Sequence, residues 1–169
     1  MNLYSLLQKR AADGNPLRIG LIGAGKFGSM YLSQVRRTVG MHLVGVADLS
    51  PVRAKSALKN VGWSAAQMSA RSFSDAAKKG STFITDDSAK MIASAEIDII
   101  IDATGNPAVG IQNVLRCCEW GKHIIMVNVE ADALARAALG TAAPRVSKGL
   151  KRRRQSRPHG QVHFDRALA

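Results

Sequence analysis

Three glycines near the N-terminus, Gly23, Gly25 and Gly28, constrain the fold of this chain more than any other feature. They follow an apolar run, residues 17–22, and precede a stretch with helical periodicity, residues 26–39. Glycine at these positions permits a tight turn, a close approach of the backbone to a phosphate, and close packing of a helix on a strand. The pattern predicts a strand, a phosphate-binding turn and a helix, which together begin a dinucleotide-binding domain.

The residues around the glycines discriminate between kinds of nucleotide site. Asp48 lies 20 residues beyond Gly28, at the end of the second apolar run, where an acceptor for the adenosine ribose hydroxyls is expected. Residues 20–26 also fit the triphosphate pattern G-x-x-x-x-G-K, but that loop needs a hydroxyl for magnesium where this chain has Phe27. We therefore predict a dinucleotide site that includes Lys26 and Phe27, with a purely structural turn as the alternative.

The choice between NAD and NADP depends on the residues after the second apolar run. Asp48 favours NAD, because a carboxylate accepts from the 2′-hydroxyl and repels a 2′-phosphate. Ser50, Arg53 and Lys55 could nonetheless contact that phosphate, although an exposed helix face explains Arg53 and Lys55 at least as well. The predicted cofactor is therefore NADP or NAD, with the preference open.

Two more loops follow apolar runs and should reach the same edge of the sheet. Thr104, Gly105 and Asn106 come after residues 97–102, and we expect them to line the nicotinamide side unless they form a turn for backbone reasons alone. Asn128 ends the next run and either reaches the nicotinamide ribose or caps a helix. The sequence does not identify a catalytic residue, and it predicts no metal site.

Apolar runs alternate with helical patterns along the chain. Strands are predicted at residues 17–22, 42–48, 82–85, 97–102 and 123–128. Helices are predicted at residues 26–39, 51–60, 63–79, 88–94 and 107–120. Near-continuous apolar strands separated by helices indicate an α/β fold, a Rossmann-type doubly wound parallel sheet of about five strands.

Three segments are expected along the chain. Residues 1–16 form a docking helix with Leu3, Leu6 and Leu7 on one face; residues 17–135 form the NAD(P)-binding domain. Residues 136–169 form a basic tail with almost no apolar periodicity, which we expect to be disordered.

The formal net charge of +12 is concentrated in this tail. From residue 134 onward there are nine basic residues and one acidic residue, so the remainder carries only +4, ordinary for an enzyme domain. The tail could neutralise nucleic-acid phosphates without sequence preference, but the charge distribution disfavours nucleic acid as the main partner.

Targeting signals are missing from the sequence. Cys117 and Cys118 are adjacent and cannot close a useful disulfide loop. No stretch fits a signal peptide or a membrane span. We expect a cytoplasmic protein with no membrane partner.

Four stretches together resemble the N-terminal NAD(P)-binding domain of homoserine dehydrogenase and of Gfo/Idh/MocA-type oxidoreductases. They are IGLIGAGKFG at 19–28, VADLSPVRA at 46–54, DIIIDATGNP at 98–107 and GKHII at 121–125. Residues 1–14 and 127–132 are most similar to the deoxyxylulose-phosphate-reductoisomerase-like branch. The resemblance implies an NADPH-linked reductase that acts on a carbonyl or hydroxyl group of a small molecule, and a homo-oligomer in the full-length family.

The chain departs from these families in two respects. They usually place a lysine shortly after the fifth strand, where this chain has Val129 and Glu130. They also continue into a substrate domain, so we expect a truncated or frameshifted chain that binds cofactor with little turnover. The alternatives are a non-catalytic dinucleotide-binding or redox-sensing module, and nucleic-acid binding through the tail.

Overall fold

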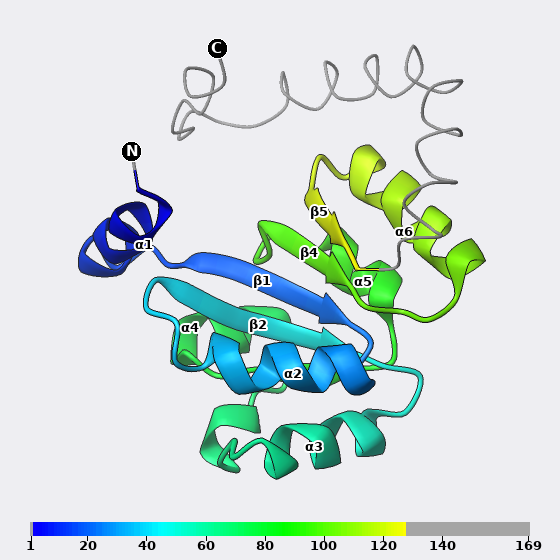
Figure 1. The fold of residues 1–169 in the computed structure, drawn as a ribbon, viewed down its shortest axis with the longest axis horizontal. Helices are drawn as coiled ribbons and strands as arrows, with labels where there is room; N and C mark the ends of the chain where they lie inside the picture. Colours follow the sequence, from blue (N-terminus) through cyan, green and yellow to red (C-terminus); the bar gives the residue numbers. More distant parts are fainter. Residues whose placement is uncertain (1, 128–169) are drawn as a thin grey trace.

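All five strands of the computed structural model, which describes residues 2–127, run parallel in one sheet (Figure 1). They are β1 (Leu17–Ile22), β2 (Met41–Ala47), β3 (Phe83–Thr85), β4 (Ile99–Asp102) and β5 (His123–Met126). Their order in the sheet is β3-β2-β1-β4-β5. The predicted doubly wound parallel sheet is confirmed, and the order reverses between β1 and β4, which is where such sheets bind ligands.

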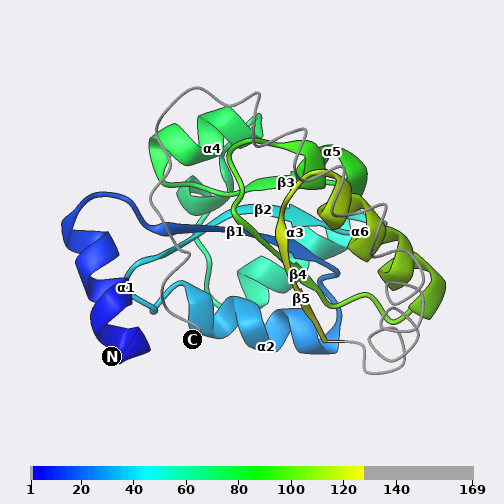
Figure 2. The same ribbon diagram turned by 90° about the horizontal axis from the view of Figure 1, so that it is seen from above.

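Five of the six α-helices in the described part cover the two faces of the sheet, and the N-terminal helix lies beside the start of β1 (Figures 1 and 2). The six helices are α1 (Leu3–Ala12), α2 (Lys26–Val35), α3 (Pro51–Asn60), α4 (Phe73–Lys79), α5 (Ser88–Ala93) and α6 (Pro107–Glu119). On one face Leu32 of α2 and Leu58 of α3 pack in a buried cluster with Leu21. On the other face α4, α5 and α6 contribute to a second cluster around Ile100. The two-sided cover explains why the strands are mostly apolar.

Side-chain caps fix where two of the predicted helices begin. The Ser50 hydroxyl accepts the Arg53 N–H at 3.3 Å, and the Asn106 side-chain oxygen accepts the Ala108 N–H at 3.0 Å. A proline follows each cap at the first helical position, where its missing N–H has no cost. The predicted starts of α3 and α6 are confirmed.

The helix predicted over residues 63–79 is wrong. The structure has a short 3-10 helix (Ala66–Met68) and then α4. Ser64 and Gln67 exchange hydrogen bonds between side chain and backbone N–H at 2.9 and 3.3 Å, and the Ser72 hydroxyl accepts the Asp75 N–H at 3.1 Å. These polar side chains each start a new local turn, because they compete with the backbone for the N–H groups that a continuous helix would use.

Helix α1 lies against the turn that precedes β2. Leu7 is buried, Leu6 is half-buried, and Leu3 is 70% exposed, so one of the three predicted apolar positions reaches the core. Gly40 has φ +82°, and a Cβ there would lie 2.1 Å from the Leu7 carbonyl oxygen. The backbone of this turn therefore contacts the backbone of α1, as only glycine permits.

Several predictions fall outside residues 2–127. They are Asn128, the domain boundary at residue 135 and the disordered tail at 136–169. Within the described part β5 ends at Met126 and α2 ends at Val35, both earlier than predicted.

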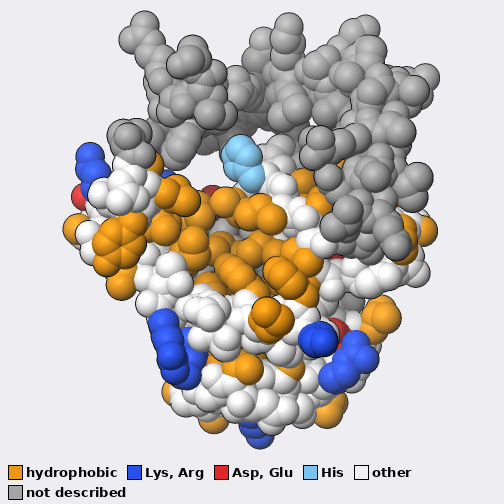
Figure 3. All heavy atoms as spheres, viewed as in Figure 1, with side chains coloured by type: hydrophobic (Ala, Val, Ile, Leu, Met, Phe, Trp, Pro, Cys, Tyr) orange, Lys and Arg blue, Asp and Glu red, His pale blue; other side chains and the backbone are white. Residues whose placement is uncertain are grey.

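One face of the sheet is covered unevenly. Helices α2 and α3 pack over β2 and β3 but have few contacts with β4 and β5. Ile125 on β5 is consequently 52% exposed. Figure 3 shows hydrophobic side chains gathered on this face, from α1 across β1 and β4.

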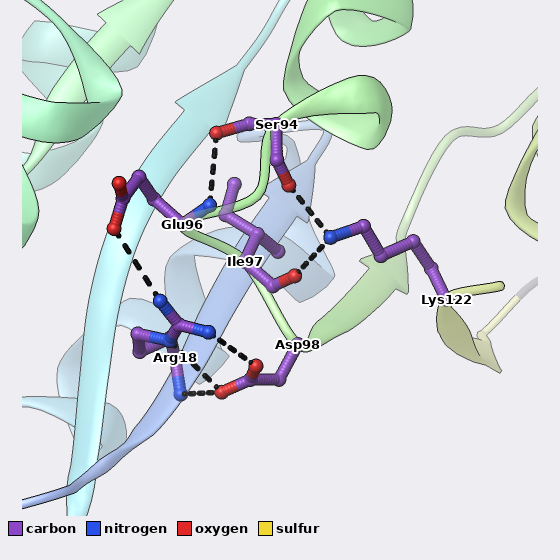
Figure 4. A network of polar contacts seen from close by, with 6 residues as sticks. All are labelled: Arg18, Ser94, Glu96, Ile97, Asp98 and Lys122. Atoms are coloured by element: carbon purple, nitrogen blue, oxygen red, sulfur yellow. Dashed lines mark hydrogen bonds and ion pairs between the residues drawn. The ribbon is translucent and has the colours of Figure 1, made fainter. Parts of the chain in front are cut away.

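A polar network joins the strands at the edge where β1 and β4 begin (Figure 4). The Arg18 guanidinium donates to both Asp98 oxygens, at 2.7 and 3.1 Å, and to a Glu96 oxygen at 3.3 Å. The Lys122 ammonium group donates to two carbonyl oxygens of the segment before β4, at 2.6 and 2.5 Å. Burial alone would raise the pKa of Asp98, but Arg18 outweighs burial and lowers that pKa below its ordinary value of 3.8.

The lowered pKa predicts a loss of stability in acid. A carboxylate with a depressed folded-state pKa stabilises the fold above its unfolded-state pKa and loses that contribution as the pH falls through the folded value. We expect Asp98→Asn to lower the free energy of unfolding by about 1 kcal/mol at neutral pH, because the pair is partly exposed. Urea unfolding should show that the difference in free energy of unfolding between the wild type and Asp98→Asn shrinks as the pH falls below 3.8. A difference that stays constant with pH would contradict a stabilising role for the ionised Asp98 carboxylate.

Candidate functional site

A cleft of about 260 Å³ opens at the edge where the parallel strands end. Seven of the residues predicted from the sequence line it: Gly23, Gly25, Asp48, Arg53, Thr104, Gly105 and Asn106. Four others flank these residues along the chain without lining the cleft: Lys26, Phe27, Gly28 and Ser50. Asn128 lies outside the described residues. The structure thus brings together residues from the ends of β1, β2 and β4.

The three glycines differ in what surrounds them. Gly23 has φ +94°, and a Cβ there would lie 2.7 Å from the Ala103 carbonyl oxygen. A Cβ on Gly28 would lie 2.2 Å from the Gly23 carbonyl oxygen. At Gly25 a Cβ would meet no atom within 4 Å. Two glycines therefore allow close backbone packing, whereas the third leaves its backbone bare toward the cleft.

Helix α2 begins at this bare backbone without a side-chain cap. Within residues 2–127 each of the other five α-helices has a side chain that accepts a hydrogen bond from its first turn. Gly25, the N-cap of α2, has no such group. The first N–H groups of a helix have no partner inside it, and the helix dipole adds partial positive charge. This end of α2 is chemically suited to a phosphate.

Asp48 lies at the end of β2 with its side chain only 3% exposed. One carboxylate oxygen accepts the Ala24 N–H at 2.9 Å; the other accepts the Ser50 N–H at 2.9 Å and an Arg53 N–H at 2.7 Å. Burial alone would raise the pKa of Asp48, but these donors outweigh burial and lower the pKa. Asp48 is therefore a charged anchor that joins the glycine turn to the start of α3.

Asp102 plays a comparable part at the end of β4, where it is fully buried. One oxygen accepts the backbone N–H and the hydroxyl of Thr104, at 2.9 and 2.6 Å. The other accepts the Asn113 side-chain amide at 2.9 Å. The buried carboxylate thus fixes the loop that lines the cleft opposite Asp48.

Sequence reasoning missed other residues that line the cleft. They are Ile22, Ala47, Leu49, Asp86, Ser88, Ala103 and Val109. Asp86 and Ser88 follow β3, which ends at the same edge as the other strands. The rule that predicted Thr104 and Asn128 would have predicted them, since residues 82–85 were recognised as a strand.

Reactive side chains away from the cleft have structural surroundings. His42 stands at the start of β2, where its ring nitrogen Nε2 hydrogen bonds with the Ser81 carbonyl oxygen at 2.9 Å. Burial raises the pKa of Cys117 to about 12, so its thiol stays protonated. Residues 2–127 contain no group of three or more His, Cys, Asp or Glu side chains arranged to hold a metal ion. We also find among them no helix with the length and hydrophobicity needed to cross a bilayer.

Comparisons with known proteins place the chain among oxidoreductases. The family model named GFO_IDH_MocA, described as an oxidoreductase family with an NAD-binding Rossmann fold, matches residues 17–126. No curated protein matches the chain.

Solved structures share the fold at low sequence identity. An NAD binding oxidoreductase from Klebsiella pneumoniae is 20% identical, with a TM-score of 0.53, over 78% of this chain and 32% of that chain. The WlbA dehydrogenase from Chromobacterium violaceum, in complex with NADH and UDP-GlcNAcA, is 19% identical, with a TM-score of 0.54, over 78% and 33%. Myo-inositol dehydrogenase from Lactobacillus casei, in complex with NAD(H) and myo-inositol, is 17% identical, with a TM-score of 0.51, over 66% and 28%. The match spans about a third of each of these structures.

The surroundings of the glycines predict different losses of stability for two alanine variants. We expect Gly28→Ala to destabilise the fold by about 1 to 3 kcal/mol, because its Cβ would collide with the Gly23 carbonyl oxygen. Gly25→Ala should cost less than about 1 kcal/mol, since its Cβ enters open space and the N-cap changes only from glycine to alanine. Thermal unfolding of both variants measures the difference, and equal losses would contradict the packing described here.

Proposed function

Because this chain belongs to the Gfo/Idh/MocA oxidoreductase family, which has an NAD-binding Rossmann fold, we propose that its cleft holds an NAD(P) cofactor for hydride transfer. The observation that carries the proposal is the uncapped start of α2 beside the bare backbone of Gly25. A phosphate needs N–H donors and room for close approach, and both are present at that point.

Residues that line the cleft, and others beside them along the chain, would contact different parts of the cofactor. Gly25 and the first turn of α2, with Lys26 and Phe27, would bind the pyrophosphate. Asp48, Ser50 and Arg53 lie at the end of β2, where the adenosine ribose belongs. The loop after β4 would line the nicotinamide side through Thr104, Gly105 and Asn106, and we assign Asn128 to the nicotinamide ribose.

A bound nicotinamide supplies or accepts a hydride at its C4 atom. The contribution of this chain is to bind and orient the ring. Asp102 holds Thr104 in the loop beside the cleft, and Asp48 holds the turn that carries Gly25. The carbon that exchanges the hydride would be held by groups outside residues 2–127. We propose a small-molecule substrate with a carbonyl or hydroxyl carbon.

Two substrate classes compete for the proposed enzyme. The sequence stretches at 1–14 and 127–132 support a reductoisomerase-like or homoserine dehydrogenase-like enzyme that uses NADPH. The solved structures described with myo-inositol and UDP-GlcNAcA support a sugar or polyol substrate. We favour the first class, because those stretches extend beyond the glycine turn that Rossmann domains share.

Cofactor titration of the 169-residue chain tests the proposed function. We expect NADH or NADPH fluorescence to change on binding, and we expect Gly25→Ala to weaken that binding at least about tenfold. The added Cβ would occupy the path of the pyrophosphate while leaving the fold intact. The matched control is Met30→Ala, because Met30 lies on the same helix, is exposed and does not line the cleft.

If neither NADH nor NADPH bound the folded chain, the proposal would be refuted. Binding without hydride transfer to aldehydes, phosphosugars or polyols is expected, because the groups that would hold the substrate carbon lie outside residues 2–127. Capture of a defined partner protein by the cofactor-bound chain would instead favour a non-catalytic dinucleotide-binding or redox-sensing module.

A further inference from the structure

Two oppositely charged side chains, one directly after β2 and one in the first turn of α3, differ in how accessible they are. The Asp48 side chain is 3% exposed, whereas the Arg53 side chain is 63% exposed. Their charged atoms are 2.7 Å apart, and both residues line the cleft. A ligand that enters this end of the cleft therefore meets the Arg53 guanidinium before it meets the Asp48 carboxylate.

The hydrogen-bonding capacity of Asp48 is largely used inside the protein. Its two oxygens accept three hydrogen bonds, from the N–H groups of Ala24 and Ser50 and from Arg53. A carboxylate that binds a ribose diol must turn acceptor oxygens toward the two hydroxyls. Here the ribose would have to displace Arg53 and reach a side chain with almost no exposed surface. The geometry thus disfavours the NAD preference expected from the position of Asp48 alone.

We propose, on the basis of the proposed cofactor site, that Arg53 contacts the adenosine ribose and selects the 2′-phosphate of NADP(H) over the 2′-hydroxyl of NAD(H). Arg53 binds Asp48 through one guanidinium nitrogen, Nη2, so the rest of its planar fork can pair with phosphate oxygens. The Ser50 hydroxyl accepts the Arg53 N–H through its oxygen and keeps its own proton to donate.

The same contacts remove the main objection to a phosphate at this place. An unpaired carboxylate would repel a 2′-phosphate, but Asp48 is paired with Arg53 and with two N–H groups. Its charge holds the guanidinium at the cleft and is itself shielded from solvent. Asp48 therefore acts as a positioning residue for Arg53.

A competing role for Arg53 is to stack on the adenine ring. Leu49 also lines the cleft and is 94% exposed, so it offers an apolar surface to the base. A guanidinium above the opposite face of the ring would strengthen binding of NAD(H) and NADP(H) alike. If Arg53 recognises the 2′-phosphate, its loss should weaken only ligands that carry this phosphate. If Arg53 stacks on the adenine, its loss should weaken every ligand that contains adenine.

The test compares 2′,5′-ADP with 5′-AMP, which differ only in the 2′-phosphate. Isothermal titration of the full chain should give a Kd for 2′,5′-ADP at least about tenfold lower than for 5′-AMP. Arg53→Gln should bring this ratio close to one by weakening 2′,5′-ADP alone, and Arg53→Lys should restore it in part, because lysine keeps the charge but lacks the fork. Lys59→Gln is the control, because it removes the same charge from the exposed far end of α3.

Each outcome separates this proposal from the proposed function. Equal affinity for the two ligands, or equal weakening of both by Arg53→Gln, would overturn selection and leave dinucleotide binding intact. No binding of either ligand, nor of NAD+ or NADP+, by a chain with a cooperative thermal transition would overturn both. A large effect of Lys59→Gln would reduce the role of Arg53 to general electrostatic attraction and would also overturn the proposal.

Discussion

Close backbone packing around Gly23 is the constraint on which the rest of the site depends. Its N–H donates to the Ala47 carbonyl oxygen at 2.8 Å, so the turn after β1 is tied to the end of β2. The space a Cβ would need at Gly23 is filled by Ala103, and Gly28 lies beneath the Gly23 carbonyl group. One residue thus brings together β2, the loop after β4 and the first turn of α2. No larger side chain could keep these three segments within reach of one ligand.

Two buried carboxylates hold this arrangement from opposite sides. Strands β2 and β4 flank β1 in the sheet; Asp48 directly follows β2, and Asp102 is the last residue of β4. Each of the two side chains accepts three hydrogen bonds from protein groups. Buried carboxylates are costly without such partners, so both acids use their hydrogen bonds to hold protein segments rather than a ligand. The groups that face the cleft then come from nearby positions, Arg53 after Asp48 and Thr104 after Asp102.

The fold was largely predictable because its signals are local. Apolar runs mark the parallel strands, and hydroxyl or amide caps followed by proline mark the starts of α3 and α6. The single helix predicted over residues 63–79 was wrong for an equally local reason. The side chains of Ser64 and Ser72 accept hydrogen bonds from nearby N–H groups and divide the segment into shorter turns. Periodicity alone cannot show which of two local hydrogen-bonding patterns prevails.

The candidate site was less predictable, because position along the chain does not determine side-chain partners. The spacing from Gly28 placed Asp48 at the correct sheet edge, but its orientation toward Ala24 depends on contacts between distant segments. Asp86 and Ser88 were missed although their strand was recognised.

The charges in the cleft explain why selectivity should reside at the end of β2. The glycine turn and the first turn of α2 offer backbone groups, which recognise a pyrophosphate common to NAD and NADP. Among residues 2–127, the charged side chains that line the cleft are Asp48, Arg53 and Asp86. Two of them are paired with each other, and that pair exposes its cation and buries its anion. The proposed site therefore presents the Arg53 guanidinium at the point where NADP carries a phosphate and NAD does not. This charge difference can be recognised without any rearrangement of the cleft.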